Sequence, residues 1–182
     1  MSPVHPHPDR RSPLVFEVNE LGRRDGAMKR IETTVPAPAE LGIGVIGVPE
    51  ESGMELNLTF QSVSEGVLVM GTVLVELAGQ CARCLDSIED EQSFDVQELF
   101  FYPGREMGED ESLVIDETID LEVPLRDAVV LELPFTPLCS QDCLGLCPDC
   151  GFNLNRDPEH GHGEKIDPRW GKLAELTGDT PN

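Results

Sequence analysis

Six cysteines in two closely spaced groups constrain this chain of 182 residues more than any other feature of its sequence. The groups are Cys81 and Cys84, and then Cys139, Cys143, Cys147 and Cys150. The first residues, MSPVHPHPDRR, contain no apolar run of the kind that a secretory signal needs, so we expect a cytoplasmic protein with reduced thiols. Reduced cysteines at these spacings predict a metal site rather than a disulfide framework.

The segment 147–151, Cys-Pro-Asp-Cys-Gly, has the form of a zinc-ribbon knuckle. Zinc in structural sites takes four thiolate or imidazole ligands in a tetrahedron, and a Cys-x2-Cys step turns tightly enough to aim both sulfurs at one ion. Pro148 fixes φ inside the turn, and Gly151 can adopt the positive φ that follows it. The segment 81–85 is a second, weaker knuckle because it lacks this glycine.

These ligands can be divided between metal ions in more than one way. Our first choice joins the two knuckles in one site and leaves a second site of two cysteines and two histidines. The first site then contains Cys81, Cys84, Cys147 and Cys150, and the second contains Cys139, Cys143, His160 and His162. The competing partition is a local site, closed by a shorter loop, that contains Cys139, Cys143, Cys147 and Cys150. The expected cofactor is Zn²⁺, with iron in a rubredoxin-like site as the alternative.

Apolar and polar residues alternate along much of the chain, which predicts an α+β fold built on an antiparallel sheet. Strands are expected at 14–18, 28–35, 54–61, 67–77, 94–101 and 112–116, with a loop at 36–52. A helix is expected from the cap Asp120 to the stop at Pro134, and a second over 168–176. The prediction is therefore an antiparallel sheet or partly closed barrel with one or two helices and a C-terminal zinc-ribbon-like segment.

Four regions are expected along the chain. They are a disordered tail at 1–12, an α+β sheet domain at 13–137, a cysteine-rich zinc-knuckle segment packed on it at 138–177, and a tail at 178–182. Hydrophobic residues make up 39% of the chain, enough to form a core in a domain of this size. Because no stretch approaches about 18 apolar residues, no membrane span is expected.

Acidic residues dominate the composition, with 35 Asp and Glu against 13 Lys and Arg and a net charge of −22. Residues 1–30 carry +2 and the rest of the chain carries −24. This balance argues against a broad basic face for duplex nucleic acid and favours a basic partner. Any RNA contact is expected to be weak and confined to one small patch, formed by Arg156, Lys165, Arg169 and Lys172.

Four motifs occur in a fixed order. They are Cys81-Ala-Arg-Cys84-Leu, Leu133-Pro-Phe-Thr-Pro-Leu-Cys139, Asp142-Cys143-Leu-Gly-Leu-Cys147-Pro-Asp-Cys150-Gly-Phe-Asn-Leu-Asn155, and Asp167-Pro-Arg-Trp170 with Leu173 and Leu176. In this order and spacing they resemble the YceD family, the large ribosomal RNA subunit accumulation proteins, over roughly residues 14–177. Many cysteine-rich members have Cys-x-Cys after the Asn-Leu-Asn, where this chain has His160-Gly-His162.

The resemblance implies a non-enzymatic factor that supports large-subunit ribosomal RNA processing or accumulation. It implies a pre-50S ribosomal particle or a basic ribosomal protein as the partner, and no small-molecule substrate. The alternative, from a different class, is a zinc-ribbon adaptor in transcription or protein assembly with no ribosomal role. The sequence contains no Gly-rich phosphate loop and no Ser–His–Asp arrangement at motif level, so an enzyme is not expected.

Overall fold

The computed structural model of this chain describes residues 9–104 and 111–162. Contacts within the chain separate it into two units. The first unit comprises residues 1–82 and 86–139, and the second comprises residues 83–85 and 140–182. Every named strand and helix belongs to the first unit.

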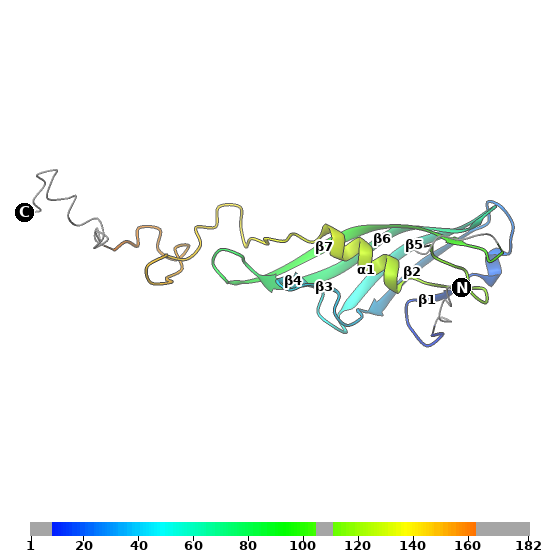
Figure 1. Ribbon diagram of the computed structural model, residues 1–182, viewed down its shortest axis with the longest axis horizontal. Coiled ribbons are helices and arrows are strands. Elements are labelled where there is room, and N and C mark those ends of the chain that lie inside the picture. Colours follow the sequence, from blue (N-terminus) through cyan, green and yellow to red (C-terminus); the bar gives the residue numbers. More distant parts are fainter. Residues whose placement is uncertain (1–8, 105–110, 163–182) are drawn as a thin grey trace, which may run out of the picture. The chain divides into compact units, whose positions relative to one another are not determined.

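Four long strands form the main antiparallel sheet (Figure 1). They are β2 (Met28–Pro36), β5 (Gly53–Val63), β6 (Gly66–Gln80) and β7 (Ser87–Phe101). β6 is central, because it pairs with β5 along one edge and with the whole of β7 along the other. Beyond β5, β2 completes the sheet on that side.

Four short strands complete the pairing. β3 (Gly42–Ile43) pairs with β4 (Ile46–Gly47), and β4 continues along β6 at Ala78 and Gly79. β1 (Val15–Glu17) and β8 (Thr118–Asp120) form a separate two-stranded sheet. A single 3-10 turn, η1 (Asn19–Leu21), follows β1.

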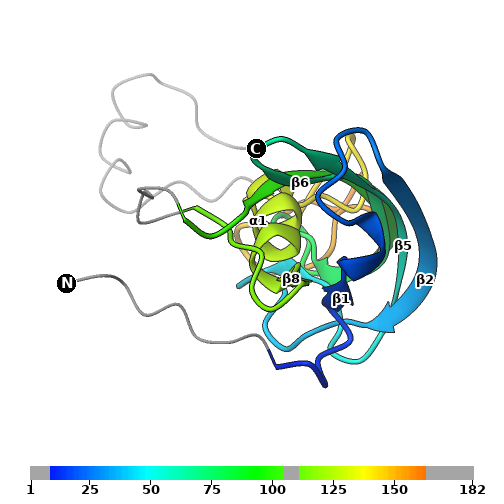
Figure 2. The same cartoon turned by 90° about the vertical axis from the view of Figure 1, so that its right-hand side faces the viewer.

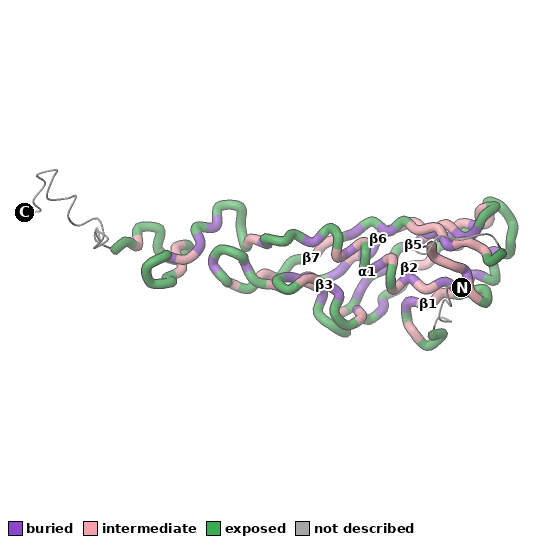
Figure 3. The backbone as a smooth tube through the Cα atoms, in the orientation of Figure 1, coloured by how far each residue is buried: buried purple, intermediate pink, exposed green. Residues whose placement is uncertain are grey.

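Buried and more exposed residues alternate along the strands, so the hydrophobic core forms on one face of the sheet. Figure 3 shows buried positions recurring along the strands, and in β5 they are the even-numbered residues from Met54 to Ser62. Figure 2 shows β2, β5 and β6 curving, with β1 and α1 on the concave side. Phe60, Phe94 and Phe100 are among the largest side chains that this arrangement buries completely or nearly so.

The helix α1 (Glu122–Glu132) packs alongside β7 and closes this core with Leu125 and Val129. The N-cap position is occupied by Leu121 rather than by the predicted Asp120, but the backbone N–H of Glu122 donates to Asp120 Oδ1 at 3.0 Å, so Asp120 still satisfies a free amide of the first turn. The helix ends at Glu132, and the C-cap Leu133 has the extended backbone that is favoured before a proline. The helix predicted between Asp120 and Pro134 is therefore confirmed.

The fold is mostly an antiparallel sheet with, among the residues described, a single α-helix, which confirms the α+β prediction. The strands do not close into a barrel, because β2 and β7 form the two edges and no pairing joins them within 9–104 and 111–162. None of the helices in these ranges is long and apolar enough to cross a membrane.

Two expectations for this unit were wrong. The region 36–52 is not only loop, because β3 and β4 form a small hairpin there. No strand forms over 112–116, where Leu113 and Ile115 make isolated bridges. Asp116 and Glu117 have φ of 49° and 59°, a left-handed conformation that breaks strand geometry, and the strand forms at β8 instead.

The other differences concern element ends. β7 begins at Ser87, seven residues before the predicted strand at 94, because its acidic first half has no apolar alternation and is held by pairing with β6. The helix predicted at 168–176 and the tail at 178–182 lie outside the described residues, as do the first eight residues of the tail predicted at 1–12.

Gly71 in β6 is opposite Leu58 in β5, and a Cβ at this position would overlap the carbonyl oxygen of Asn57. Gly71→Ala is expected to lower the free energy of unfolding by about 1–3 kcal/mol, because the backbone of β5 must move to accommodate the methyl group. Gly44→Ala is the matched control, since nothing lies within 4 Å of its added Cβ. Urea unfolding of both variants measures the difference, and equal stability would contradict this packing.

Candidate metal centre

The second unit contains a small hairpin that forms the 147–151 knuckle. Leu146 bridges to Asn153, and the N–H of Leu154 donates to the carbonyl of Gly145 at 3.0 Å. Inside this hairpin the N–H of Gly151 donates to the carbonyl of Cys147 at 2.8 Å, and Gly151 has a φ of 73°. The tight turn and the positive φ predicted for this knuckle are therefore confirmed.

Cys147 and Cys150 lie beside His160 and His162, and one sulfur or ring nitrogen from each of the four lies within 4.8 Å of those of the others. Three of these atoms form a triangle. Cys150 Sγ is 3.2 Å from the Nε2 of each histidine, and the two Nε2 atoms are 3.2 Å apart. We call these four residues the cysteine–histidine cluster.

Three separate two-centre hydrogen bonds cannot account for all sides of this triangle. A neutral imidazole carries one N–H, so the Nε2 atoms of His160 and His162 cannot each donate to Cys150 Sγ while one also accepts from the other. Ligands held at about 2.0–2.3 Å in a zinc tetrahedron are about 3.3–3.8 Å apart. The separations of 3.2 Å are close to that spacing, so the donor atoms converge as they do around one small cation.

The surroundings of the cysteine–histidine cluster favour its metal-binding form. The ring of Phe152 stacks on His160 with centroids 4.5 Å apart, which fixes the orientation of the imidazole. Backbone N–H groups of Asp149 and Cys150 hydrogen-bond to the Cys147 sulfur and hold the pKa of this thiol below its usual value, with the Asp149 amide contributing most. A lowered pKa favours the thiolate, which is the form that binds a metal.

The remaining four cysteines form a second group, which we call the tetracysteine cluster. The sulfurs of Cys81, Cys84, Cys139 and Cys143 all lie within 4.8 Å of one another, and all but Cys139 are buried. The N–H of Cys81 donates to the carbonyl of Asp86, and the N–H of Ala82 donates to the carbonyl of Pro137, each at 2.8 Å. These bonds hold the chain just before Cys139 beside the turn that follows β6.

Two residues of the second unit support Cys143. Arg83 donates from its Nη1 to the carbonyl oxygen of Cys143 at 3.0 Å. Asn155 donates from Nδ2 to the sulfur of Cys143 at 3.3 Å and accepts the N–H of Leu144 through Oδ1 at 2.8 Å. Groups that hydrogen-bond to a ligand in this way orient it and tune its affinity for metal.

The structure brings together the same eight residues that the sequence singled out, but in a partition that neither prediction contained. The predicted four-cysteine site joined 81–84 with 147–150, whereas the structure groups 81–84 with Cys139 and Cys143, and 147–150 with the two histidines. The local site at 139–150 is not formed either. The N–H of Ala82 donates to the carbonyl of Pro137, which brings Cys139 to the 81–86 turn. The 145–154 hairpin is followed closely in sequence by the 157–162 loop, so its two cysteines meet the two histidines of that loop.

Sequence reasoning missed the residues that support the ligands. The sequence pattern predicts no role for Arg83, Phe152 or Asn155. Asn155 ends the Asn-Leu-Asn motif that follows the knuckle, and that motif was the only signal for it. Of the basic patch predicted to contact RNA, Arg156 is exposed and the three other members lie outside the described residues.

Both clusters could hold a metal ion, since four thiolates, or two thiolates and two imidazoles, are donor sets of closed structural sites. The four protein donors of each cluster are enough to complete a tetrahedron. Such a closed arrangement stabilises the local fold and leaves no position for a reacting water.

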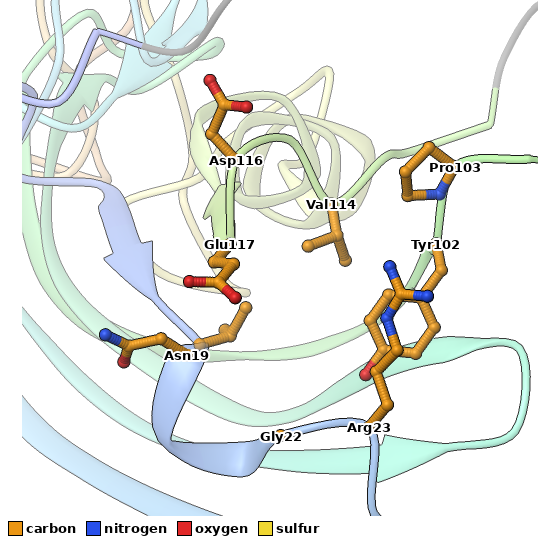
Figure 4. Close-up of a pocket in the computed structure, with 9 residues that line it drawn as sticks. Asn19, Gly22, Arg23, Tyr102, Pro103, Val114, Asp116 and Glu117 are labelled. Carbon is orange, nitrogen blue, oxygen red and sulfur yellow. The ribbon is translucent and has the colours of Figure 1, made fainter.

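A separate pocket of about 230 Å³ lies in the first unit (Figure 4). Figure 4 shows Asn19 and Glu117 on one side of it, with Tyr102 and Arg23 on the other. The Arg23 guanidinium is 4.9 Å from the centroid of the Tyr102 ring, close enough for a cation–π contact. No Ser, Cys or His is among the nine residues that line the pocket, so it offers no such nucleophile.

The chain is similar to known proteins over most of its length. Residues 69–177 match the family described as "Large ribosomal RNA subunit accumulation protein YceD". An uncharacterized protein of Mycobacterium tuberculosis is 48% identical over 172 residues, which cover 92% of this chain and 83% of that protein. A relative in Mycobacterium leprae is 41% identical over 170 residues, covering 91% of this chain and 78% of the relative.

A more distant similarity carries a functional name. The maize protein called "Large ribosomal RNA subunit accumulation protein YCED homolog 1, chloroplastic" is 26% identical over 151 residues, covering 80% of this chain and 47% of the maize protein. No solved structure is significantly similar to this chain.

The partition predicts which metal site is lost when one pair of ligands is removed. We expect the chain to bind two metal ions, and the double variant Cys147→Ser with Cys150→Ser to bind one. The remaining ion is then held by four thiolates, because the tetracysteine cluster is intact. Cobalt substitution tests this, since the thiolate-to-cobalt charge-transfer absorption grows with the number of thiolate ligands.

The control is His160→Ala with His162→Ala, which removes the other half of the cysteine–histidine cluster and should leave the same four-thiolate spectrum. A two-thiolate spectrum in the cysteine variant would instead support the partition that joins the two knuckles. Fewer than about 0.3 metal ions per chain in the wild-type protein would rule out both sites.

The turn at 81–86 contains a strained residue. Leu85 has a φ of 62°, a left-handed conformation that a branched, bulky side chain rarely adopts, and its side chain is 59% exposed. Leu85→Gly is expected to raise the free energy of unfolding by about 1 kcal/mol by relieving this strain. Leu85→Ala is the control, because it removes the side chain but keeps the Cβ. Thermal unfolding of the two variants checks the difference, and a stabilising Ala would refute the strain argument.

Proposed function

Because this chain belongs to the YceD family, we propose that it is a non-enzymatic, zinc-binding factor that supports the processing and accumulation of large-subunit ribosomal RNA. The observation that carries the proposal is the family match over residues 69–177, which includes all eight candidate ligands. The name of the maize relative describes the same role in the accumulation of the large ribosomal RNA. We place this action in the cytoplasm, in the course of ribosome biogenesis.

Zinc is the metal we propose for both clusters. Thiolate and imidazole ligands suit it, and in closed sites of this kind it serves structure rather than catalysis. The described part of the second unit contributes no residue to the hydrophobic core, so bound metal would supply much of the energy that folds it. The ion's role here is to hold the cysteine-rich segment in a defined shape.

The charge of the protein indicates the kind of partner. A net charge of −22 repels phosphate and attracts basic proteins. Bound zinc changes this little, since two ions bring +4 while six thiolates bring −6. We therefore propose that the protein acts on a pre-50S particle through a basic ribosomal protein, with only weak contact to the RNA itself.

Affinity capture from growing cells tests this function. The protein should recover large-subunit precursor particles and their ribosomal RNA, and its depletion should reduce mature large subunits relative to small subunits in sedimentation profiles. Recovery of RNA polymerase or another assembly, with normal subunit ratios after depletion, would favour the adaptor role without a ribosomal link.

A titration separates protein contact from RNA contact. Naked ribosomal RNA should bind more weakly than the particle at matched salt, with a steeper loss of affinity as salt rises. Arg156→Glu serves as the control for RNA contact through the one described member of the basic patch. RNA that binds as tightly as the particle would contradict the proposed protein contact.

A further inference from the structure

A groove of about 440 Å³ lies between α1 and β7 in the first unit. The helix contributes Val123, Pro124, Asp127, Ala128, Leu131 and Glu132, and the sheet side contributes Asp95, Gln97, Glu98 and Ser112. We call it the α1–β7 groove. It contains none of the candidate metal ligands, so it is a separate feature of the molecule.

The helix exposes large apolar side chains in this groove. Val123 is 66% exposed and Leu131 is 81% exposed, although both belong to an amphipathic helix whose opposite face is buried. They lie two turns apart, with Asp127 between them, on one face of α1. Two large apolar side chains this exposed beside one groove offer apolar area that a partner could cover.

The same groove has a strongly acidic border. Asp95, Glu98, Asp127 and Glu132 line it, and no Lys, Arg or His is among its lining residues. Ser112 donates to Glu98 Oε1 at 2.7 Å, which helps to hold that carboxylate in place. Four carboxylates beside exposed apolar side chains are complementary to a segment that combines positive charge with apolar side chains.

The one basic residue of α1 is directed elsewhere. Arg126 donates to the carbonyl oxygens of Glu40 at 2.6 Å and Ala39 at 3.1 Å, and it pairs with Glu122 at 3.4 Å. It is therefore bound to the loop before β3 rather than to the groove carboxylates. The groove keeps its negative potential, and a nucleic acid would meet four like charges there.

We propose that the α1–β7 groove binds a basic, partly apolar peptide segment of a protein partner. Apolar side chains of the segment cover Val123 and Leu131, and flanking lysines or arginines pair with the four carboxylates. The identity of such a partner as a ribosomal protein rests on the proposed function, but binding of the segment itself does not. Nucleic acid, a second copy of this chain and the chain's own residues 163–182 are the occupants that the experiment must distinguish.

The probe is a synthetic peptide in which single leucines alternate with lysine-glycine pairs, titrated into the full chain by calorimetry. The variant Val123→Ser with Leu131→Ser should weaken binding by at least about tenfold, because it removes the two exposed apolar side chains of the groove. Val45→Ser is the matched control, since Val45 is an exposed apolar residue of the same unit, at 42%, outside the groove. Circular dichroism verifies that the helix is intact.

A second pair of variants tests the charge. Asp127→Asn with Glu132→Gln should weaken binding several-fold and flatten its salt dependence, whereas Glu50→Gln with Glu51→Gln, outside the groove, should change neither. Peptides with glutamate in place of lysine, or serine in place of leucine, should not bind. Amide chemical shifts should change at 95–98 and 123–132.

Several outcomes would overturn the proposal. Equal losses in the groove and control variants would show only nonspecific attraction to an acidic protein, and shift changes in the groove with an RNA oligonucleotide would assign it to nucleic acid. A dimer in sedimentation that dissociates in the Val123/Leu131 variant would assign the groove to a second copy. Stronger peptide binding after deletion of 163–182, with competition by that segment added as a free peptide, would assign it to the chain itself.

Failure of this proposal is distinguishable from failure of the proposed function. If particle capture succeeds and the peptide does not bind, the ribosomal role stands without this groove. If the peptide binds as expected and depletion leaves ribosomal subunits unchanged, the groove stands and its partner lies outside the ribosome.

Discussion

The pairing of β6 with β7 is the constraint on which the rest of the structure depends. The register runs from Gly66 opposite Phe101 to Gln80 opposite Ser87 without a break, so the turn at 81–86 can form at only one place. The opposite edge of β6 fixes β5 and β4 by the same hydrogen bonding. One strand thus positions both the hydrophobic core and the first pair of candidate ligands.

The two units are stabilised by different forces. Every residue of the described hydrophobic core lies in the first unit, where alternating strand residues meet α1. The second unit relies on backbone hydrogen bonds of the 145–154 hairpin, on side chains such as Asn155, and on a set of two thiols and two imidazoles that a metal could complete. A short segment without an apolar core commonly needs such a cross-link to fold.

The sequence predicted those parts of the fold in which local pattern and tertiary environment agree. The strands at β5 and β6, and the helix between Asp120 and Pro134, have the periodicity that their burial requires. The first half of β7 lacks this periodicity, because its polar residues form a strand only by pairing with the long strand β6. The candidate ligands were evident from spacing alone, but their partition depends on a long-range bond from Ala82 to Pro137 that no local pattern encodes.

The small sheet of β1 and β8 has a consequence for how the chain is made. Val15 pairs with Asp120, and the N–H of Leu121 donates to the carbonyl of Leu14, so the first strand finds its partner only after most of the first unit has been synthesised. On a translating ribosome, β2, β5 and β6 can pair while the apolar residues of β1 are still exposed. Closing so long a loop is entropically costly and slow, which makes this step a candidate for the last event in folding the core.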